Sequence, residues 1–352
     1  MEEKKKTARE IIEGYDGPPV RIMEVCGTHT HEIFRLGIRK LLPEQVELIS
    51  GPGCPVCVTQ VGFIDEAIYL ALERQVTICT FGDLVRVPGT NMSLAGARER
   101  GAKIRIVYSP VDAKEYAKEH PKEQVTFLSV GFETTTPSAC LSVKKAREEG
   151  LTNYSILTAN KTMPQAYEAL KESADIFLYP GHVNAITGTK LCEELAKEGV
   201  SGVVAGFKAK ELLTGLAVAL ARFQEGRPFF VNCYPRVVTE NGSPQAQKLV
   251  EEMMEPCDSE WRGLGVIKGS GMRLQEEWSA FDARKKYKIP LIQGKANPAC
   301  RCGDVLQGKC KPSDCKVFGK VCTPQHPIGA CMVSGEGACS AYYMYGEAEK
   351  MK

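Results

Sequence analysis

The sequence predicts an α/β protein with mostly parallel sheets. Between about residues 20 and 290, short β-branched runs alternate with helical stretches, which is the pattern of strands joined by crossover helices. Most of the strand-like runs are apolar throughout, as expected for parallel strands that are buried on both faces. After about residue 290 the chain becomes rich in Cys, Gly, Pro and Lys, so we expect a separate small region there.

The expected elements follow from this alternation. Strands are expected at 20–25, 46–50, 76–80, 103–108, 125–130, 154–158, 175–179, 200–205 and 228–232. Helices are expected at 63–74, 138–149, 164–172, 189–197, 211–225 and 244–254. We expect a first α/β domain at 1–145, a second at 146–290, and a cysteine-rich domain at 291–352.

Charge and hydropathy exclude several classes of protein. In 352 residues, 45 Lys and Arg stand against 43 Asp and Glu, and this net charge of +2 argues against a nucleic-acid partner. We find no apolar run of about 18 residues, so no membrane span is expected. The charged first residues lack the apolar core of a signal peptide, so we expect a cytoplasmic protein.

Several expected strands end in a glycine loop that carries chemically active side chains. In parallel sheets, ligands bind beyond the carboxyl ends of the strands, so we expect these loops to converge on one or two clefts. The loops contain Cys26 with Thr28 and His29, Cys54, Asp83, Glu133 and His182.

The cysteines of the C-terminal region are the strongest signal. Seven of the 15 cysteines fall in the last 53 residues, at 300, 302, 310, 315, 322, 331 and 339. A cytosolic protein of this size does not need a disulfide framework, so the clustering indicates metal binding or thiol chemistry. Zinc sites usually carry two Cys-x2–4-Cys knuckles, and the wider spacing here favours a [4Fe–4S] cluster. Zinc and free thiols are the alternatives.

Two further motifs carry cysteines near the N-terminus. Cys54 and Cys57, in the turn GPGCPVC, can form a reversible disulfide or bind a metal, and the alternative is a buried structural pair. Cys26 lies close to His29 and His31, an arrangement that suits a metal ligand or an activated thiolate. For each histidine the alternative is a hydrogen bond to loop backbone.

The remaining candidates are single polar residues. Glu133 is a candidate acid–base group, although its segment also has the pattern of a helix N-terminus. Asp83 and His182 are candidate ligand-binding residues, and the sequence supports the two equally. The chain lacks the phosphate loop, the dinucleotide-binding glycine motif and the Gly-x-Ser-x-Gly elbow, so nucleotide-dependent and serine-hydrolase activities have no support.

Five segments together resemble the HypD family of [NiFe]-hydrogenase maturation factors. They are MEVCGTHT at 23–30, GPGCPVC at 51–57, GFETTTP at 131–137, CRCG at 300–303 and GEGAC at 335–339. The segments occur in the family's order and span nearly the whole chain. The resemblance implies two α/β domains around a cleft and a third domain that carries a [4Fe–4S] cluster. It also implies a scaffold on which the Fe(CN)2CO group is assembled, with the chaperone HypC and the cyanide donor HypE as partners.

The resemblance also implies roles for individual residues. Cys26 would hold the iron and share it with a cysteine of the chaperone, while Cys54 and Cys57 would be a redox pair. Beside the resemblance, the chemistry of the residues indicates that Thr28, His29 and backbone N–H groups could orient the cyanide ligands, which are strong hydrogen-bond acceptors. The implied cluster ligands are Cys300, Cys315, Cys322 and Cys339, with Cys302 and Cys331 as the residues that could replace one of them.

Two other functions compete with the assembly scaffold. One is an iron–sulfur thiol–disulfide oxidoreductase that acts on a protein substrate through Cys54 and Cys57. The other is a structural zinc protein whose C-terminal region is a binding module. Neither needs the Cys26 segment, and a zinc module does not need Cys54 and Cys57.

Overall fold

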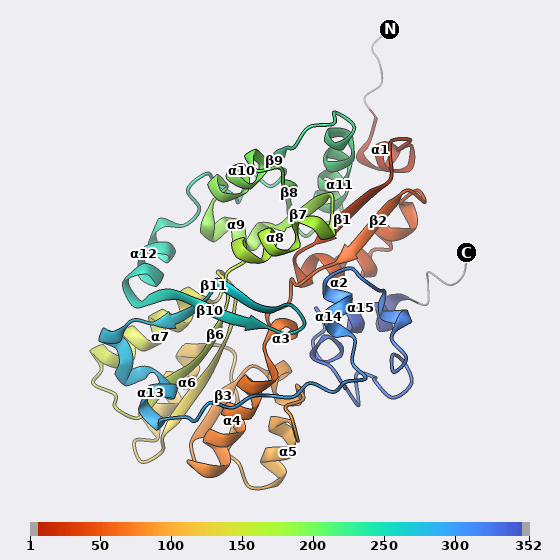
Figure 1. Ribbon diagram of the computed structural model, residues 1–352. Coiled ribbons are helices and arrows are strands. Elements are labelled where there is room, and N and C mark those ends of the chain that lie inside the picture. Colours follow the sequence, from red (N-terminus) through yellow and green to blue (C-terminus); the bar gives the residue numbers. More distant parts are fainter. Residues whose placement is uncertain (1–5, 347–352) are drawn as a thin grey trace.

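The computed structural model describes residues 6–346, whose strands form two parallel sheets and one antiparallel hairpin (Figure 1). The five-stranded sheet has the order β2-β1-β7-β8-β9, and the four-stranded sheet has the order β4-β3-β5-β6. The first comprises β1 (Val20–Glu24), β2 (Val46–Ser50), β7 (Ile176–Pro180), β8 (Ser201–Ala205) and β9 (Phe230–Asn232). The second comprises β3 (Thr77–Thr80), β4 (Ile104–Ile106), β5 (Val125–Gly131) and β6 (Tyr154–Asn160), and the hairpin comprises β10 (Met254–Trp261) and β11 (Gly265–Leu274).

Helices connect these strands. They are α1 (Ala8–Glu13), α2 (Gly27–Arg35), α3 (Pro55–Val58), α4 (Val61–Glu73), α5 (Leu94–Glu99), α6 (Pro110–Glu119), α7 (Thr136–Glu148), α8 (Pro164–Leu170), α9 (Gly181–Thr187), α10 (Lys190–Lys197), α11 (Ala209–Phe223), α12 (Pro244–Met253), α13 (Ala283–Tyr287), α14 (Cys302–Leu306) and α15 (Ala338–Tyr345). Across residues 6–346, none of the helices combines the length and the apolar character that crossing a bilayer requires.

The predicted fold class is confirmed. Each predicted strand is present within a few residues of its expected bounds, and all strand pairs of the two sheets are parallel. The hairpin of β10 and β11 was not predicted. Between its two buried ends, its first strand alternates between half-buried and exposed positions and carries Pro256, so it lacks the continuous apolar pattern that marks most of the other strands.

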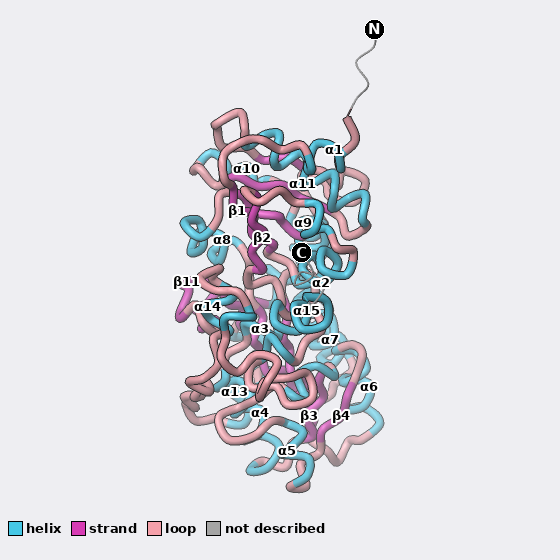
Figure 2. The backbone as a smooth tube through the Cα atoms, turned by 90° about the vertical axis from the view of Figure 1, so that its right-hand side faces the viewer, coloured by secondary structure: helices cyan, strands magenta, loops and turns pink. Residues whose placement is uncertain are grey.

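The chain is divided between the two sheets in a way that differs from the domain boundary expected at residue 145. Strands β5 and β6, which flank that residue, are neighbours in the four-stranded sheet over a register of seven residue pairs. Strands β1 and β2 instead pair within the five-stranded sheet, where β1 also pairs with β7. The chain therefore leaves the larger sheet after β2, builds the smaller sheet, and returns at β7. The two sheets lie in opposite halves of an elongated molecule (Figure 2).

The centre of the molecule is a shared core. One buried cluster contains Met23 of β1, Tyr179 of β7, Trp261 of β10, Cys57 of α3 and Cys331 of the C-terminal region. Burying large apolar side chains of this kind stabilises a fold by about 1.5–3 kcal/mol each. The C-terminal region, with little apolar sequence of its own, is therefore held against both sheets.

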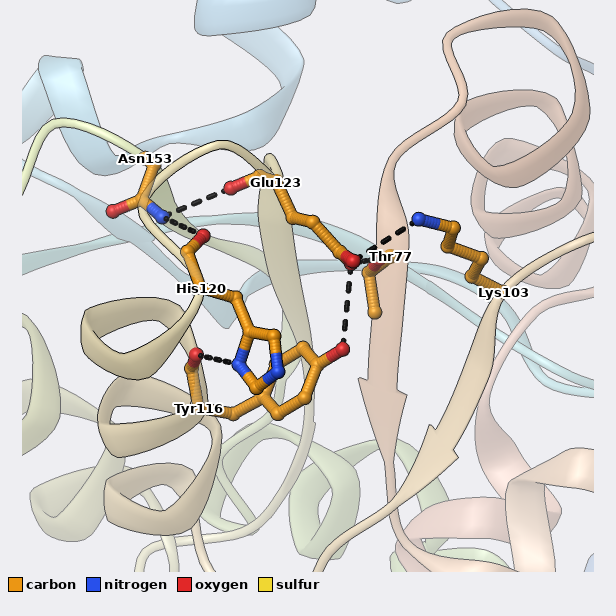
Figure 3. A network of polar contacts seen from close by, with 6 residues as sticks. All are labelled: Thr77, Lys103, Tyr116, His120, Glu123 and Asn153. Atoms are coloured by element: carbon orange, nitrogen blue, oxygen red, sulfur yellow. Dashed lines mark hydrogen bonds and ion pairs between the residues drawn. The ribbon is translucent and has the colours of Figure 1, made fainter.

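A polar network secures the amino ends of the smaller sheet, at the edge opposite the glycine loops (Figure 3). The Glu123 carboxylate accepts hydrogen bonds from Thr77 Oγ1 at 2.7 Å, Lys103 Nζ at 3.1 Å and Tyr116 OH at 3.3 Å. The Asn153 amide donates to three main-chain carbonyl oxygens between 2.8 and 3.2 Å. Thr77, Lys103, Glu123 and Asn153 start or precede the four strands. They are joined to one another and to α6 by hydrogen bonds, which indicates a structural role.

Candidate functional site

Cys26 is positioned by the end of β1 and the start of α2. Its backbone is extended and forms the N-cap of α2, so its thiol lies at the positive end of that helix. Burial raises the pKa of the thiol to about 12, and this rise is opposed by the backbone N–H groups of His29 and Thr28. Those donors are arranged to stabilise a thiolate, which is the form that binds a metal.

Gly53 places the loop that carries Cys54 and Cys57 against Cys26. A Cβ atom at Gly53 would overlap the backbone nitrogen and Cα of Cys26, so no other residue fits without movement. The Gly27 N–H also donates to the Gly53 carbonyl oxygen at 3.0 Å. The loop that carries Cys54 is thus joined to the backbone that carries Cys26.

The C-terminal region closes over α2 from another side, with α15 packed beside α2 (Figure 1). A Cβ atom at Gly27 would lie 2.6 Å from Glu336 Cβ, so the two backbones touch. Thr28 Oγ1 donates to Glu336 Oε1 at 2.7 Å, and His31 Nδ1 lies 3.1 Å from the Gly335 carbonyl oxygen. The role of Glu336 was not predicted, although the neighbouring Gly337, where a Cβ atom would overlap the Cys331 backbone, is a visible signal of close backbone contact.

His29 is fully buried beneath Cys26. Burial lowers the pKa of its imidazole to about 4, so the ring is neutral near pH 7. Its Nε2 lies 3.0 Å from the Gly206 carbonyl oxygen, which can only accept, so Nε2 carries the proton. Its Nδ1 is buried and has no hydrogen-bond partner among the described residues. His182 stacks on Phe207, which also contacts the His29 ring, so the two histidines flank one aromatic side chain.

Cys54 and Cys57 form the turn that the sequence predicts. Cys54 is the N-cap of α3, Pro55 occupies the first helical position, and Cys54 Sγ accepts from the Cys57 N–H at 3.3 Å. Cys57 is fully buried, and its pKa is raised by burial and by hydrogen bonds of its thiol with Cys331 and Cys54. The pair therefore contacts the C-terminal thiols directly.

Cys331 is the centre of the C-terminal thiol group. It lies in a 3-10 turn (Ala330–Met332), and its sulfur is hydrogen-bonded by the thiols of Cys302, Cys339 and Cys57, which lower its pKa. The Cys300 thiol donates to Cys302 Sγ at 3.2 Å. We name the residues joined in this way the thiol network: Cys54, Cys57, Cys300, Cys302, Cys331 and Cys339.

Cys322 and Cys315 relate to this network differently. Cys322 Sγ accepts from the Ile328 N–H at 3.4 Å, and the Cys300 and Cys302 thiols raise its pKa after burial, so it borders the network. The Cys315 thiol donates to the Ala299 carbonyl oxygen at 3.8 Å and lies near Arg301. Within residues 6–346 no three His, Cys, Asp or Glu side chains already surround a point that could hold a metal ion, so the ligand set stays a prediction.

Glu133 lies at the carboxyl end of β5, in the same core. Its Oε1 accepts from the Met163 N–H at 2.8 Å, while its buried Oε2 has no partner in the described part of the chain. Burial raises the pKa of this carboxyl to about 7, so it can hold or release a proton near neutral pH. The adjacent Tyr167 is also buried, and its pKa is raised by burial and then by the charges of Glu133 and other groups that include Cys26.

Asp83 is exposed in a 3-10 turn (Gly82–Arg86) after β3.

Fold and site together define a class of protein: a parallel α/β chain in which a buried cysteine, a Cys-x-x-Cys turn and a cysteine-rich region share one core. A sequence model of the HypD family, described as "Hydrogenase formation hypA family", matches residues 2–346. The chain belongs to the HypD family of hydrogenase maturation factors.

Known relatives match this chain in sequence over almost its full length. The chain is 42% identical to the hydrogenase maturation factor HypD of Cupriavidus necator over 347 residues, which is 95% of this chain and 92% of that protein. It is 44% identical to HypD of Rhodobacter capsulatus over 94% of this chain and 90% of that protein. For HypD of Escherichia coli the identity is 43%, with the same shares covered.

Proposed function

We propose that the chain is the scaffold on which the Fe(CN)2CO group of [NiFe]-hydrogenases is assembled, and that Cys26 holds the iron of this group. The observation that carries the proposal is the setting of Cys26: a buried thiol at a helix N-terminus, beside the backbone N–H groups of Thr28 and His29. A thiolate suits iron(II) with cyanide and CO ligands. A HypC-type chaperone shares the iron through its own cysteine, and a HypE-type protein donates the cyanide.

Nearby polar groups have the chemistry to hold cyanide ligands, whose nitrogen atoms accept hydrogen bonds. Tyr167 OH and Glu133 Oε2 are buried without a partner in the described residues. The raised pKa of Glu133, about 7, lets it keep a proton to donate near neutral pH. Thr28 contributes its backbone N–H beside the Cys26 sulfur, because its hydroxyl donates to Glu336, and the neutral His29 ring is fully buried.

The thiol network supports a redox role for the same scaffold. When Cys54 and Cys57 form a disulfide, they release two electrons and two protons, and reduction takes up the same number. Cys57 contacts Cys331, so the pair has a continuous thiol path to the C-terminal region.

The C-terminal residues also fit a [4Fe–4S] cluster. They supply several thiols in one place, and a Cβ atom at Gly329 would overlap the sulfurs of Cys300 and Cys302, so glycine keeps that space open. Cys300, Cys315, Cys322 and Cys339 are the proposed ligands. Such a cluster supplies one-electron transfer.

A thiol–disulfide oxidoreductase that acts on a protein substrate is the second candidate. The contact between Cys57 and Cys331 favours it, because the two thiols can exchange. However, Cys54 is 4% exposed and Cys57 is fully buried, so the disulfide of another protein cannot reach them without opening the core. The burial therefore favours an internal redox pair.

Complementation tests the proposed function. In a bacterial strain that lacks its own HypD, this chain should restore hydrogenase activity, and Cys26→Ala should abolish it. The matched control is Cys140→Ala, because Cys140 is also buried but lies in α7 within the core of the smaller sheet. Restored activity with Cys26→Ala would contradict the proposal, as would loss of activity with the control at normal protein levels.

A further inference from the structure

The turn between β10 and β11 lies between two cysteine-bearing segments of the shared core. The Arg262 backbone N–H donates to the Val58 carbonyl oxygen at 2.8 Å, so the turn is joined to the end of α3. The next residue, Gly263, touches the C-terminal region, because a Cβ atom there would lie 2.1 Å from Gly303 Cα. The turn is therefore fixed between the Cys-x-x-Cys segment and the start of α14, where Cys302 lies.

Arg262 is held in this turn and carries an unpaired donor. The residue is only 9% exposed, and its Nε donates to the Thr59 carbonyl oxygen at 2.8 Å. Its Nη2 is buried and has no hydrogen-bond partner among the described residues. A buried guanidinium with an unused N–H group is destabilising unless a negatively charged acceptor completes its hydrogen bonds. The free donor therefore indicates such an acceptor beside Arg262.

The sulfur atoms of the C-terminal region are the acceptors that fit. Arg262 lines a pocket of about 250 Å³ together with Cys300 and Cys302. Its positive charge also acts on the Cys300 thiol, against the larger rise in the pKa of that thiol that Cys302 and burial cause. Asp304 is the one carboxylate at this pocket among the described residues, and it already pairs with Arg301 Nε at 2.9 Å. Thiolate or cluster sulfur is thus the negatively charged acceptor that remains.

We propose that Nη2 of Arg262 donates a hydrogen bond to a sulfur of the [4Fe–4S] cluster that the C-terminal cysteines hold, and that this contact raises the reduction potential of the cluster. The inference rests on the proposed function, because it requires that cluster. Reduction adds one electron, and the added negative charge strengthens both the hydrogen bond and the attraction to the guanidinium. Net charge and hydrogen bonds to sulfur are among the factors that set the potential of such clusters.

Redox titration of the anaerobically purified protein tests this assignment, with the reduced cluster followed by electron paramagnetic resonance. Arg262→Met removes both the donor and the charge. It should lower the ratio of reduced to oxidised cluster at a fixed potential about tenfold, which is about 59 mV for a one-electron couple. Arg262→Lys keeps the charge and should recover part of this shift. The matched control is Arg273→Met in the same hairpin, whose exposed guanidinium pairs with Glu255, and it should leave the potential unchanged.

A measurement on the unaltered protein keeps the test decisive if the Arg262 variants do not fold. The protein is produced with arginine that carries ¹⁵N in its guanidinium group, and pulsed electron paramagnetic resonance of the reduced cluster detects the ¹⁵N nuclei that couple to its spin. We expect a coupled ¹⁵N nucleus in the unaltered protein and in Arg273→Met. The coupling should be absent from a folded Arg262→Lys protein, which assigns it to this residue.

An unchanged potential in a folded Arg262→Met protein would overturn the assignment, as would a reduced cluster in the unaltered protein without a coupled ¹⁵N nucleus. An unaltered protein without iron and sulfide would remove the proposed cluster itself, and this assignment with it. The iron and sulfide content, which is measured first, distinguishes the two failures. Neither readout involves the iron at Cys26 or hydrogenase activity.

Discussion

The backbone of Gly53 lies directly against the backbone of Cys26, close enough that a Cβ atom at position 53 would overlap the Cys26 nitrogen and Cα. This contact joins the turn that carries Cys54 and Cys57 to the start of α2, where the Cys26 thiol lies. The two motifs are separated by more than twenty residues, yet their backbones are in contact and share a hydrogen bond from the Gly27 N–H to the Gly53 carbonyl oxygen.

Gly53→Ala should therefore separate the two motifs. The added methyl group meets backbone rather than a flexible side chain, so the main chain must shift, at a cost of about 1–3 kcal/mol. Urea unfolding measures this loss. Gly335→Ala is the matched control, because a Cβ there meets no atom within 4 Å. Equal stability of the two variants would contradict the close contact.

His29 should make stability depend on pH. The unfolded chain protonates this imidazole near its ordinary pKa of 6.5, whereas burial lowers the folded pKa to about 4. Between these values the unfolded state binds more protons, so stability falls as the pH drops from 6.5 towards 4. The total loss is about 3 kcal/mol, from about 1.4 kcal/mol per pH unit.

His29→Gln should remove that part of the pH dependence, while His326→Gln, at an exposed position, should not. Unfolding free energies measured across this pH range give the comparison. If the slope between pH 6.5 and 4 is the same in all three proteins, the imidazole of His29 is not buried in its neutral form.

Glu336 should control the reactivity of Cys26. Its negative charge contributes to the raised pKa of the Cys26 thiol after burial, and its carboxylate holds the Thr28 hydroxyl. Glu336→Gln should lower that pKa and speed alkylation of Cys26 roughly threefold or more at pH 8, as removal of one nearby like charge predicts. Glu240→Gln, at a distant exposed site, is the control. A slower or unchanged rate at Cys26, read by mass spectrometry, would argue against this electrostatic coupling.

Cys322 should be needed for the proposed iron–sulfur cluster. Cys322→Ser should lower the iron and sulfide content and the melting temperature, because metal binding supplies folding energy to a region with little apolar sequence. Cys310→Ser should change neither, since Cys310 is outside the proposed ligand set. Full iron and sulfide content in the Cys322 variant would remove this residue from the ligands.

The positions of the strands could be predicted from the sequence, whereas their pairing into two sheets could not. Strand β2 was predicted residue for residue, because its apolar residues Val46, Leu48 and Ile49, followed directly by the glycine turn, are a local signal. The pairing of β1 with β7 is not local: their paired residues are about 150 positions apart. No composition change marks the point where the chain leaves one sheet for the other, so the boundary at residue 145 did not match.

The candidate site shows the same contrast. Cys26, Cys54 and Glu133 could be identified because each follows a predicted strand in a glycine loop. The contact of Thr28 with Glu336 spans 308 residues, and that of Cys57 with Cys331 joins two motifs at opposite ends of the chain. Trp261 belongs to the hairpin that was not predicted, so its place in the shared core had no signal in the sequence.

Infrared spectroscopy of Cys26→Ala tests the central claim most directly. The chain and its variant are purified anaerobically with a co-expressed HypC-type chaperone, and the CN and CO stretching bands are recorded beside the visible spectrum. A metal–thiolate bond has no substitute in this position, so the variant should lose the bands almost completely while its visible absorption stays unchanged. Iron with CN and CO bands at wild-type intensity in the Cys26→Ala protein would contradict the claim that Cys26 holds the iron.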